Sequence, residues 1–226
     1  MICPINKERE FQDRRKEMRK NIQILQNIVS RKGSSKVLTF SIPHIFKALQ
    51  LLSKEKFVSR ATFGKEIHLG EGAVKTLISH LKEVKMIEST KSGSFLTEKG
   101  LKFSNQIQKT IPKECLIKKC NLIPGKNNHA IILKNYAFAI KTGIEQRDYA
   151  IMYGSSGCTT ILFQENRFVF PKEDKDCFSN DKKTKKYLLE NLEPEDGDVI
   201  IVSSSDDPFV AEISAKNSAL WTLATN

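Results

Sequence analysis

Glu71-Gly-Ala-Val-Lys-Thr-Leu-Ile-Ser-His-Leu-Lys-Glu-Val84 is the stretch that decides the fold of the first half of the chain. Its apolar residues recur at spacings of three and four, which places them on one face of an α-helix: Val74, Leu77, Ile78 and Leu81. The face opposite carries Gly72, Thr76, Ser79 and Glu83, and basic side chains flank it. A helix held from behind by a narrow apolar face can enter a DNA major groove, about 12 Å wide, without steric conflict. The stretch therefore predicts a helix over residues 71–84 whose outer face suits a duplex.

The residues before this helix predict a second helix that packs against it. Ser59 can accept hydrogen bonds from the first N–H groups of a helix over residues 60–67. Gly64 lies ten residues before Val74, where two closely approaching helices need a small side chain. His68 stands where the turn of a helix-turn-helix usually has glycine, and histidine tolerates left-handed backbone better than most residues.

The residues after the helix predict a wing. Two short strands, Met86-Ile-Glu-Ser-Thr90 and Phe95-Leu96, are joined by the glycine-containing turn Lys91-Ser-Gly-Ser94. Thr97-Glu-Lys-Gly100 then caps a further helix. This order of elements is typical of a winged helix-turn-helix, and we expect that domain to occupy residues 37–112.

The charge distribution indicates what this domain binds. Residues 1–112 hold 22 Lys/Arg and 10 Asp/Glu, a net charge of +12, whereas residues 113–226 hold 15 and 16, a net charge of −1. All the excess positive charge therefore lies in the first half, which implies a polyanionic partner there. We expect this partner to be duplex DNA, contacted by Arg60, Lys75, Thr76, Ser79, His80, Lys82, Lys91 and Lys99.

These candidates divide by position. Lys75, Thr76 and Ser79 would contact bases or nearby phosphates from the 71–84 helix. Lys91 would serve the wing, and the other basic residues would hold phosphates.

A basic helix is predicted over residues 6–31, within an N-terminal extension over residues 1–36. Its apolar seam has heptad-like spacing: Phe11, Met18, Ile22, Leu25 and Val29. Three roles are open for it: packing on its own domain, forming a dimer, or lying on DNA phosphates. The run at residues 31–36 predicts a hinge after this helix.

Residues 113–226 alternate β-rich runs with amphipathic helices, which indicates a small α/β-type domain and makes the whole chain α+β. Strands are predicted at 117–123, 129–134, 159–163, 167–170 and 198–203. Helices are predicted at 144–153, 184–191 and 207–223.

Two donor-rich turns in this domain suggest a small-molecule site at the carboxyl ends of its strands. One is Ser203-Ser-Ser-Asp-Asp-Pro208, which opens a helix, and the other is Gly154-Ser-Ser-Gly157. The candidate ligand residues are Arg147, Asp148, Ser155, Ser156, Ser204, Ser205 and Asp206. The alternative interpretation is an ordinary helix cap, an ordinary turn and a structural ion pair.

Other features limit the chemistry. The five cysteines are Cys3, Cys115, Cys120, Cys158 and Cys177, and none has the two-residue spacing of a zinc or redox motif. We expect reduced, mostly buried thiols, no metal and no cofactor. No phosphate loop, nucleophile elbow or complete Ser/His/Asp set occurs. No apolar run reaches the roughly 18 residues that span a bilayer, so we expect a cytoplasmic protein with no membrane contact.

A family resemblance covers about residues 41–224. Ile67-His-Leu-Gly-Glu-Gly-Ala-Val-Lys-Thr-Leu77 and Leu96-Thr-Glu-Lys-Gly100 resemble the winged helix of an archaeal family of proposed transcription regulators. Gly143–Ile151, Gly154–Phe163 and Asp196–Val202 resemble that family's C-terminal domain of unknown function. The resemblance implies the two-domain architecture and does not extend to the basic N-terminal helix.

The sequence thus favours a DNA-binding transcription regulator that is not an enzyme. The C-terminal domain would dimerise the chain into a homodimer, sense a small-molecule effector, or do both. Two alternatives are an enzyme that acts on a small metabolite through residues 113–226, and an adaptor that binds proteins through the basic helix.

Overall fold

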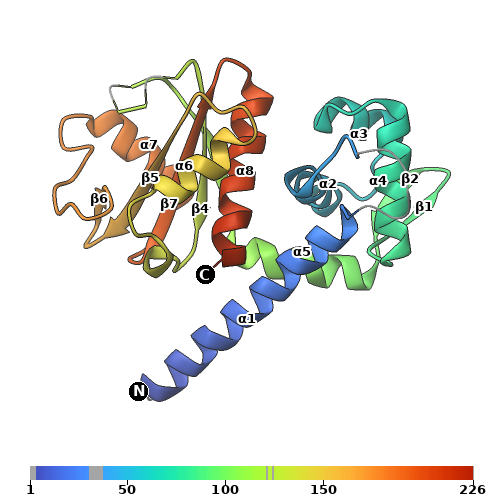
Figure 1. The fold of residues 1–226 in the computed structure, drawn as a ribbon, viewed down its shortest axis with the longest axis horizontal. Coiled ribbons are helices and arrows are strands. Elements are labelled where there is room, and N and C mark those ends of the chain that lie inside the picture. Colours follow the sequence, from blue (N-terminus) through green and yellow to red (C-terminus); the bar gives the residue numbers. More distant parts are fainter. Residues whose placement is uncertain (1–3, 31–37, 121, 124, 226) are drawn as a thin grey trace. The chain divides into compact units, whose positions relative to one another are not determined.

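The computed structural model describes residues 4–30, 38–120, 122–123 and 125–225 (Figure 1). The chain forms two compact units, Met1–Ile107 and Gln108–Asn226. The division falls inside helix α5 (Glu98–Thr110), slightly before the boundary after residue 112 that the sequence suggests. The N-terminal helix belongs to the first unit.

The first unit is built on three short helices, α2 (Ile42–Lys54), α3 (Arg60–Ile67) and α4 (Glu71–Glu83). Ser59 caps α3 as predicted, because its Oγ accepts from the Thr62 N–H at 3.0 Å. His68 ends α3 in the left-handed conformation, with φ 55°. At Gly64, a Cβ would lie 3.2 Å from the Leu69 carbonyl oxygen, so a small residue suits this turn. The predicted helix-turn-helix is therefore present.

The wing is a two-stranded antiparallel hairpin of β1 (Ile87–Thr90) and β2 (Gly93–Leu96). Val58 exchanges two backbone hydrogen bonds with Ser94, at 2.8 and 2.9 Å, and so ties the segment before α3 to the wing. Gly93 has φ +133°, and a Cβ there would lie 2.8 Å from the Val58 carbonyl oxygen. Only glycine fits this position without strain.

The junction between α4, the wing and α5 is formed by Leu96-Thr-Glu-Lys-Gly100. The Thr97 hydroxyl donates to the Lys85 carbonyl at 2.7 Å and accepts from the Gly100 N–H at 3.1 Å. Lys99 Nζ donates to the Val84 carbonyl at 2.7 Å, at the end of α4. Gly100 is buried so closely that a Cβ would lie 1.9 Å from the Met86 carbonyl oxygen.

Helix α1 (Pro4–Ile28) packs against the first unit through its second half. Met18, Ile22, Leu25 and Ile28 are buried, and Asn21 Nδ2 lies 3.4 Å from Gln106 Oε1 of α5. These contacts match the first of the three roles that the sequence leaves open. Phe11 and the predicted hinge lie outside the described side chains and residues.

The second unit contains a five-stranded sheet in the order β3-β4-β7-β5-β6. Its strands are β3 (Glu114–Ile117), β4 (Asn127–Leu133), β5 (Gly157–Gln164), β6 (Arg167–Val169) and β7 (Asp198–Ser205). Every neighbouring pair is antiparallel. The α+β class is therefore correct. A shared carboxyl edge, on which the ligand-site prediction depends, is absent because neighbouring strands run in opposite directions.

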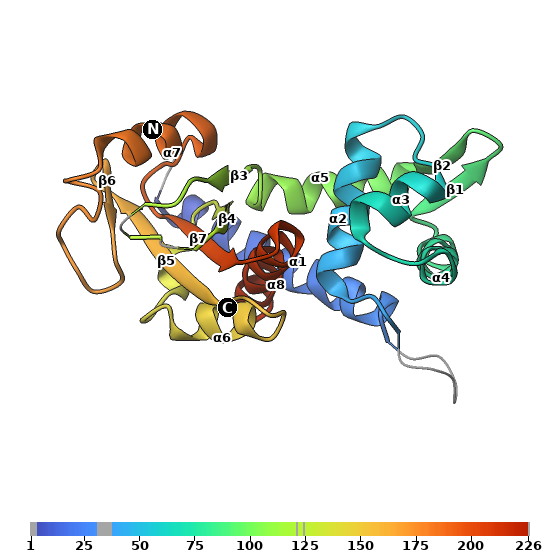
Figure 2. The same cartoon turned by 90° about the horizontal axis from the view of Figure 1, so that it is seen from above.

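Helices cover both faces of this sheet (Figure 2). Helices α6 (Ile144–Ile151) and α8 (Pro208–Thr225) pack on one face. The short helix η1 (Ala137–Ala139) precedes α6 in the chain. Helix α7 (Lys182–Leu192) packs on the other face, where Leu188 and Leu192 join a core with Ile132, Phe163 and Ile200. The strand predicted at 117–123 is wrong: the edge strand lies at 114–117, followed by an isolated Cys120–Ile123 bridge.

A buried charged cluster links α8 to the edge of the sheet. The Lys216 side chain is fully buried and bonds Glu114 of β3 and Glu212 of its own helix. His129 Nε2 lies 3.2 Å from Glu114 Oε2. Burial alone would raise the pKa of Glu114, but Lys216 and His129 hold it well below its usual value. Glu114 is thus an ionised anchor for the buried lysine.

No helix in the described residues combines the length and apolar character of a membrane-spanning segment.

The Gly100 contact predicts a specific sensitivity. Replacing Gly100 with Ala should destabilise the protein by about 2 kcal/mol or more, because the Met86 carbonyl cannot accommodate a methyl group at 1.9 Å. Gly72→Ala is the matched control, since nothing lies within 4 Å of its added Cβ on α4, and it should stabilise by about 0.5–1 kcal/mol. Urea unfolding of the full chain measures both. Equal effects of the two substitutions would contradict the described junction.

The start of α2 predicts an acid-sensitive step in stability. His44 Nδ1 accepts from the Ser41 N–H at 3.3 Å, and burial, reinforced by Lys47, lowers its pKa from 6.5 to about 4. Between these values the unfolded chain takes up a proton that the folded chain refuses. The free energy of unfolding should therefore fall, by at most about 3 kcal/mol, as pH drops from 6.5 to 4. His44→Gln should lose less stability than the parent chain between pH 7 and pH 4.5 in urea titrations. An identical loss in both proteins would exclude this role for His44.

Candidate nucleic-acid interface

Helix α4 presents one apolar face to the first unit and a polar face to solvent. Val74, Leu77, Ile78 and Leu81 are at most 9% exposed, as the periodicity predicts. Lys75, Ser79 and Lys82 are exposed, and Thr76 is half-buried. The helix therefore has the amphipathic character required of a recognition helix.

Two side chains on the polar face have partners within the helix. Thr76 donates its hydroxyl hydrogen to the Gly72 carbonyl at 3.0 Å, so its oxygen remains as an acceptor. Lys75 Nζ lies 2.8 Å from Glu71 Oε1, and both side chains are more than half exposed. The hydrogen bond from Lys75 lowers the pKa of Glu71. Such an exposed ion pair contributes little to stability, so a phosphate can compete for Lys75.

His80 occupies a structural position that the sequence did not indicate. Its Nδ1 lies 2.6 Å from the Ile28 carbonyl oxygen, at the end of α1, and its ring meets that of Phe40 edge-on at 5.8 Å. This ring therefore joins α4 to α1, and the expectation that His80 contacts DNA stays a prediction. The α1 contact could not be inferred from the periodicity of α4 alone.

Lys99 is likewise used within the fold, through its bond to the Val84 carbonyl. The Lys99 ammonium group has other N–H groups. Its bond to the Val84 carbonyl nevertheless makes it a cap for the end of α4. Arg60 at the start of α3, Lys82 near the end of α4 and Lys91 at the wing turn are all exposed. The structure thus brings basic residues to α3, α4 and the wing within one compact unit.

Two further exposed lysines belong with these basic residues, although the sequence did not predict them as DNA contacts. Lys65 lies on α3, and Lys85 lies between α4 and β1 with φ 57°. Only Met86 separates Lys85 from the first wing strand, so its position next to both elements could have been inferred from the predicted boundaries. For Lys65 the sequence offers only its charge.

The candidate ligand residues of the second unit hold the sheet together. Ser155 Oγ and Ser156 Oγ each donate to the Ser204 carbonyl at 3.0 Å. Ser204 Oγ donates to Asn128 Oδ1 at 2.6 Å. Asn127 Nδ2 donates to the backbone carbonyls of Ser205 and Asp206, at 3.3 and 2.7 Å.

The remaining members of that set also have ordinary structural positions. Arg147 pairs with its neighbour Asp148 at 3.4 Å, and both side chains are more than half exposed. The cap of α8 is Asp207, whose Oδ1 accepts from the Phe209 N–H at 2.7 Å. The helix-cap and turn interpretation therefore accounts for the serine runs.

The four described cysteines are partly buried, so the expectation of mostly buried thiols is wrong for them. Burial raises the pKa of Cys115 to about 11 and that of Cys158 and Cys177 to about 12, so these groups remain protonated at neutral pH. None of the described cysteines forms a disulfide. Within the described ranges, no group of three or more His, Cys, Asp or Glu is arranged to hold a metal ion. Cys3 lies outside the described residues.

Comparisons with known proteins support the two-part organisation. Residues 45–102 match the family described as "PH0730-like, N-terminal domain", and residues 123–223 match "Domain of unknown function (DUF4443)". Among solved structures, the chain is similar to hypothetical protein PH0730 from Pyrococcus horikoshii OT3. The identity is 26% and the TM-score 0.65, over 80% of this chain and 91% of that chain. No protein with a curated description matches. The chain thus resembles PH0730-like proteins in its first part and matches a domain of unknown function in its second.

Proposed function

We propose that this protein is a transcription regulator that binds duplex DNA through its first unit. The observation that carries the proposal is the exposed polar face of α4, a helix that contacts the wing strand β1 in a unit of high positive charge. Residues 1–107 hold 21 Lys/Arg and 10 Asp/Glu, a net charge of +11, whereas residues 108–226 hold 16 of each. A field of this kind attracts a polyanion and steers it to the unit.

In this proposal α4 enters the major groove. Lys75, Thr76 and Ser79 face the bases or the nearest phosphates, and Lys91 contacts the backbone or the minor groove from the wing. Arg60 and Lys82 hold phosphates on either side, and Lys65 and Lys85 extend that basic surface. His80 and Lys99 act within the fold.

The second unit supplies what a single winged helix lacks. We propose that it dimerises the chain, responds to an effector, or does both. A homodimer would place its two α4 helices on the two half-sites of a palindromic DNA site. The DNA sequences that the protein prefers would then show the same two-fold symmetry.

Charge removal at the interface tests the binding mode. Lys82→Ala and Lys91→Ala together should weaken binding to all duplexes by about the same factor. The slope of log affinity against log salt, expected near −4 to −5 for about five contacted phosphates, should become less steep by about 1.8. Lys172→Ala with Lys175→Ala removes equal charge from the second unit and should leave the slope unchanged. Fluorescence anisotropy with a labelled duplex measures both. A parent chain that binds no duplex, or a control pair with the same loss, would remove the proposal.

Sequence recognition requires a separate test. Selection from a random duplex library should return a motif with the parent chain and a relaxed motif with Ser79→Ala, because Ser79 is the exposed hydroxyl on the outer face of α4. Bases outside the positions read by Ser79 should be retained. Selection of unrelated sequences by the parent chain would limit the function to non-specific binding.

A further inference from the structure

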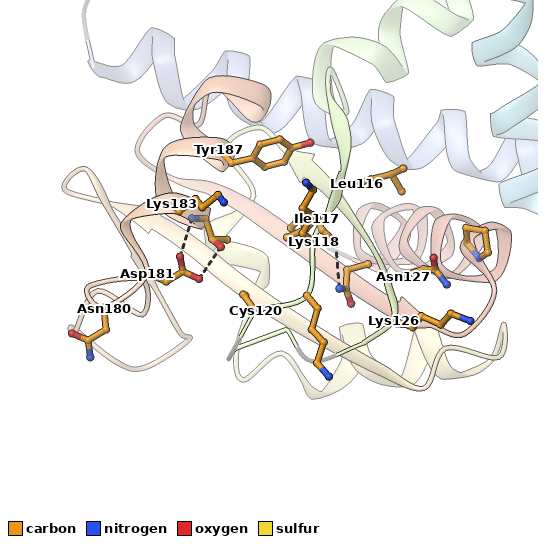
Figure 3. A pocket seen from close by; sticks show the side chains of 14 residues that line it. Leu116, Ile117, Lys118, Cys120, Lys126, Asn127, Asn180, Asp181, Lys183 and Tyr187 are labelled. Carbon is orange, nitrogen blue, oxygen red and sulfur yellow. Dashed lines mark hydrogen bonds between the residues drawn. The ribbon is translucent and has the colours of Figure 1, made fainter.

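A pocket of about 830 Å³ opens in the second unit, on the side of the sheet edge where α7 packs against β3. Its volume is in the range of small-ligand sites, roughly 300–1,000 Å³. None of the candidate ligand residues chosen from the sequence lines it. The lining combines four lysines with apolar and aromatic surface: Lys118, Lys119, Lys126, Lys183, Leu116 and Tyr187 (Figure 3).

The register of the sheet explains why three of these lysines line one pocket. Ile117 of β3 pairs with Asn128 of β4, so Lys118 and Lys119 leave one strand where Lys126 enters the other. Helix α7 contributes Lys183 and, one turn later, Tyr187 on the same face. Residues far apart in sequence thus converge on one pocket.

The described residues of the connection between β3 and β4 form hydrogen bonds of their own. Cys120 and Ile123 exchange two backbone hydrogen bonds, each 3.1 Å long. Asn128 Nδ2 donates to the Gly125 carbonyl at 2.9 Å, and a Cβ on Gly125 would lie 2.5 Å from Asn128 Oδ1. These contacts lie next to Lys119 and Lys126 in sequence.

The pocket lysines differ from many other basic residues of the unit. Lys113, Lys134, Lys185 and Lys216 each form an ion pair with a carboxylate. In the described part of the chain, no ion pair is formed by the four pocket lysines.

The one carboxylate among the pocket's lining residues, Asp181, offsets only part of the charge of the four lysines. Asp181 caps α7: its Oδ1 accepts from the Thr184 N–H at 3.0 Å, and its Oδ2 accepts from the Thr184 hydroxyl at 2.7 Å. The unit as a whole has no net charge. The four lysines therefore give the pocket a local excess of positive charge within a unit whose charges cancel overall.

We propose that this pocket binds a small polyanion with an aromatic body, of which a nucleoside diphosphate is representative. The lysines neutralise the phosphates, and the 40%-exposed Tyr187 ring offers a stacking surface for the base. The assignment concerns ligand binding by the second unit and does not depend on DNA binding by the first.

Equilibrium binding of ADP to the full chain tests the site. With EDTA present and at moderate salt, ADP and GDP should bind saturably, pyrophosphate more weakly, and adenosine more weakly still. Lys118→Ala, Lys126→Ala and Lys183→Ala together should reduce ADP affinity at least tenfold. The matched control combines Lys141→Ala, Lys172→Ala and Lys175→Ala, three exposed lysines of the same unit that do not line the pocket, and should change affinity less than twofold.

The aromatic contribution is measured separately. Tyr187→Phe should retain ADP affinity, whereas Tyr187→Ala should lose about fivefold or more and leave pyrophosphate binding unchanged. Equal melting temperatures of the variants and the parent chain verify folding.

Three results would overturn the inference: no saturable binding of ADP, GDP or pyrophosphate at millimolar concentration, equal losses in the pocket and control triples, or equal affinity for ADP in Tyr187→Ala and Tyr187→Phe. A fourth result would also overturn it, by assigning the pocket lysines to nucleic-acid binding. In that case duplex DNA would displace ADP, and the pocket triple would weaken DNA binding more than the control triple. Failure of DNA binding by the first unit would leave the ADP result unaffected.

Discussion

The carbonyl of Met86 is the point on which the first unit depends. It accepts from the Thr97 N–H at 3.0 Å and from the Thr97 hydroxyl at 3.2 Å, and it lies against Gly100. One backbone group thus fixes the residue that follows α4, the end of the wing and the start of α5. Since the polar face of α4 is useful only when α4 and the wing are held together, this junction sets the geometry of the proposed DNA interface.

Local patterns predicted the first unit well because its elements are close in sequence. The cap at Ser59, the left-handed His68 and the buried stripe of α4 each depend on residues within a few positions. The role of His80 could not be predicted, since its partner Ile28 is 52 residues away. The pairing of strands in the second unit was equally out of reach, because β7 inserts between β4 and β5.

Sequence patterns in the second unit are easily misinterpreted because many of its polar residues are buried. Ser214, Lys216, Asn217 and Ser218 are fully buried in α8. The Ser218 hydroxyl donates to the Gln146 carbonyl at 2.8 Å, and Asn217 Nδ2 donates to the Tyr149 carbonyl at 2.7 Å. These hydrogen bonds to backbone carbonyls offset the cost of burying the Ser218 hydroxyl and Asn217 Nδ2. The exposed residues that suit a ligand are lysines that looked like ordinary solvated charges.

The two units use positive charge in different ways, and this difference bears on regulation. In the first unit the net charge is large and distributed over the surface, which favours a long, uniformly charged polymer. In the second unit, 16 basic and 16 acidic residues cancel overall, yet four lysines remain without ion pairs at one pocket among the described residues. A compact charge cluster selects a small, highly charged ligand, because only such a ligand brings several negative charges within one pocket. Such a ligand would change DNA affinity only to the extent that it binds one DNA-competent state of the chain more tightly than another.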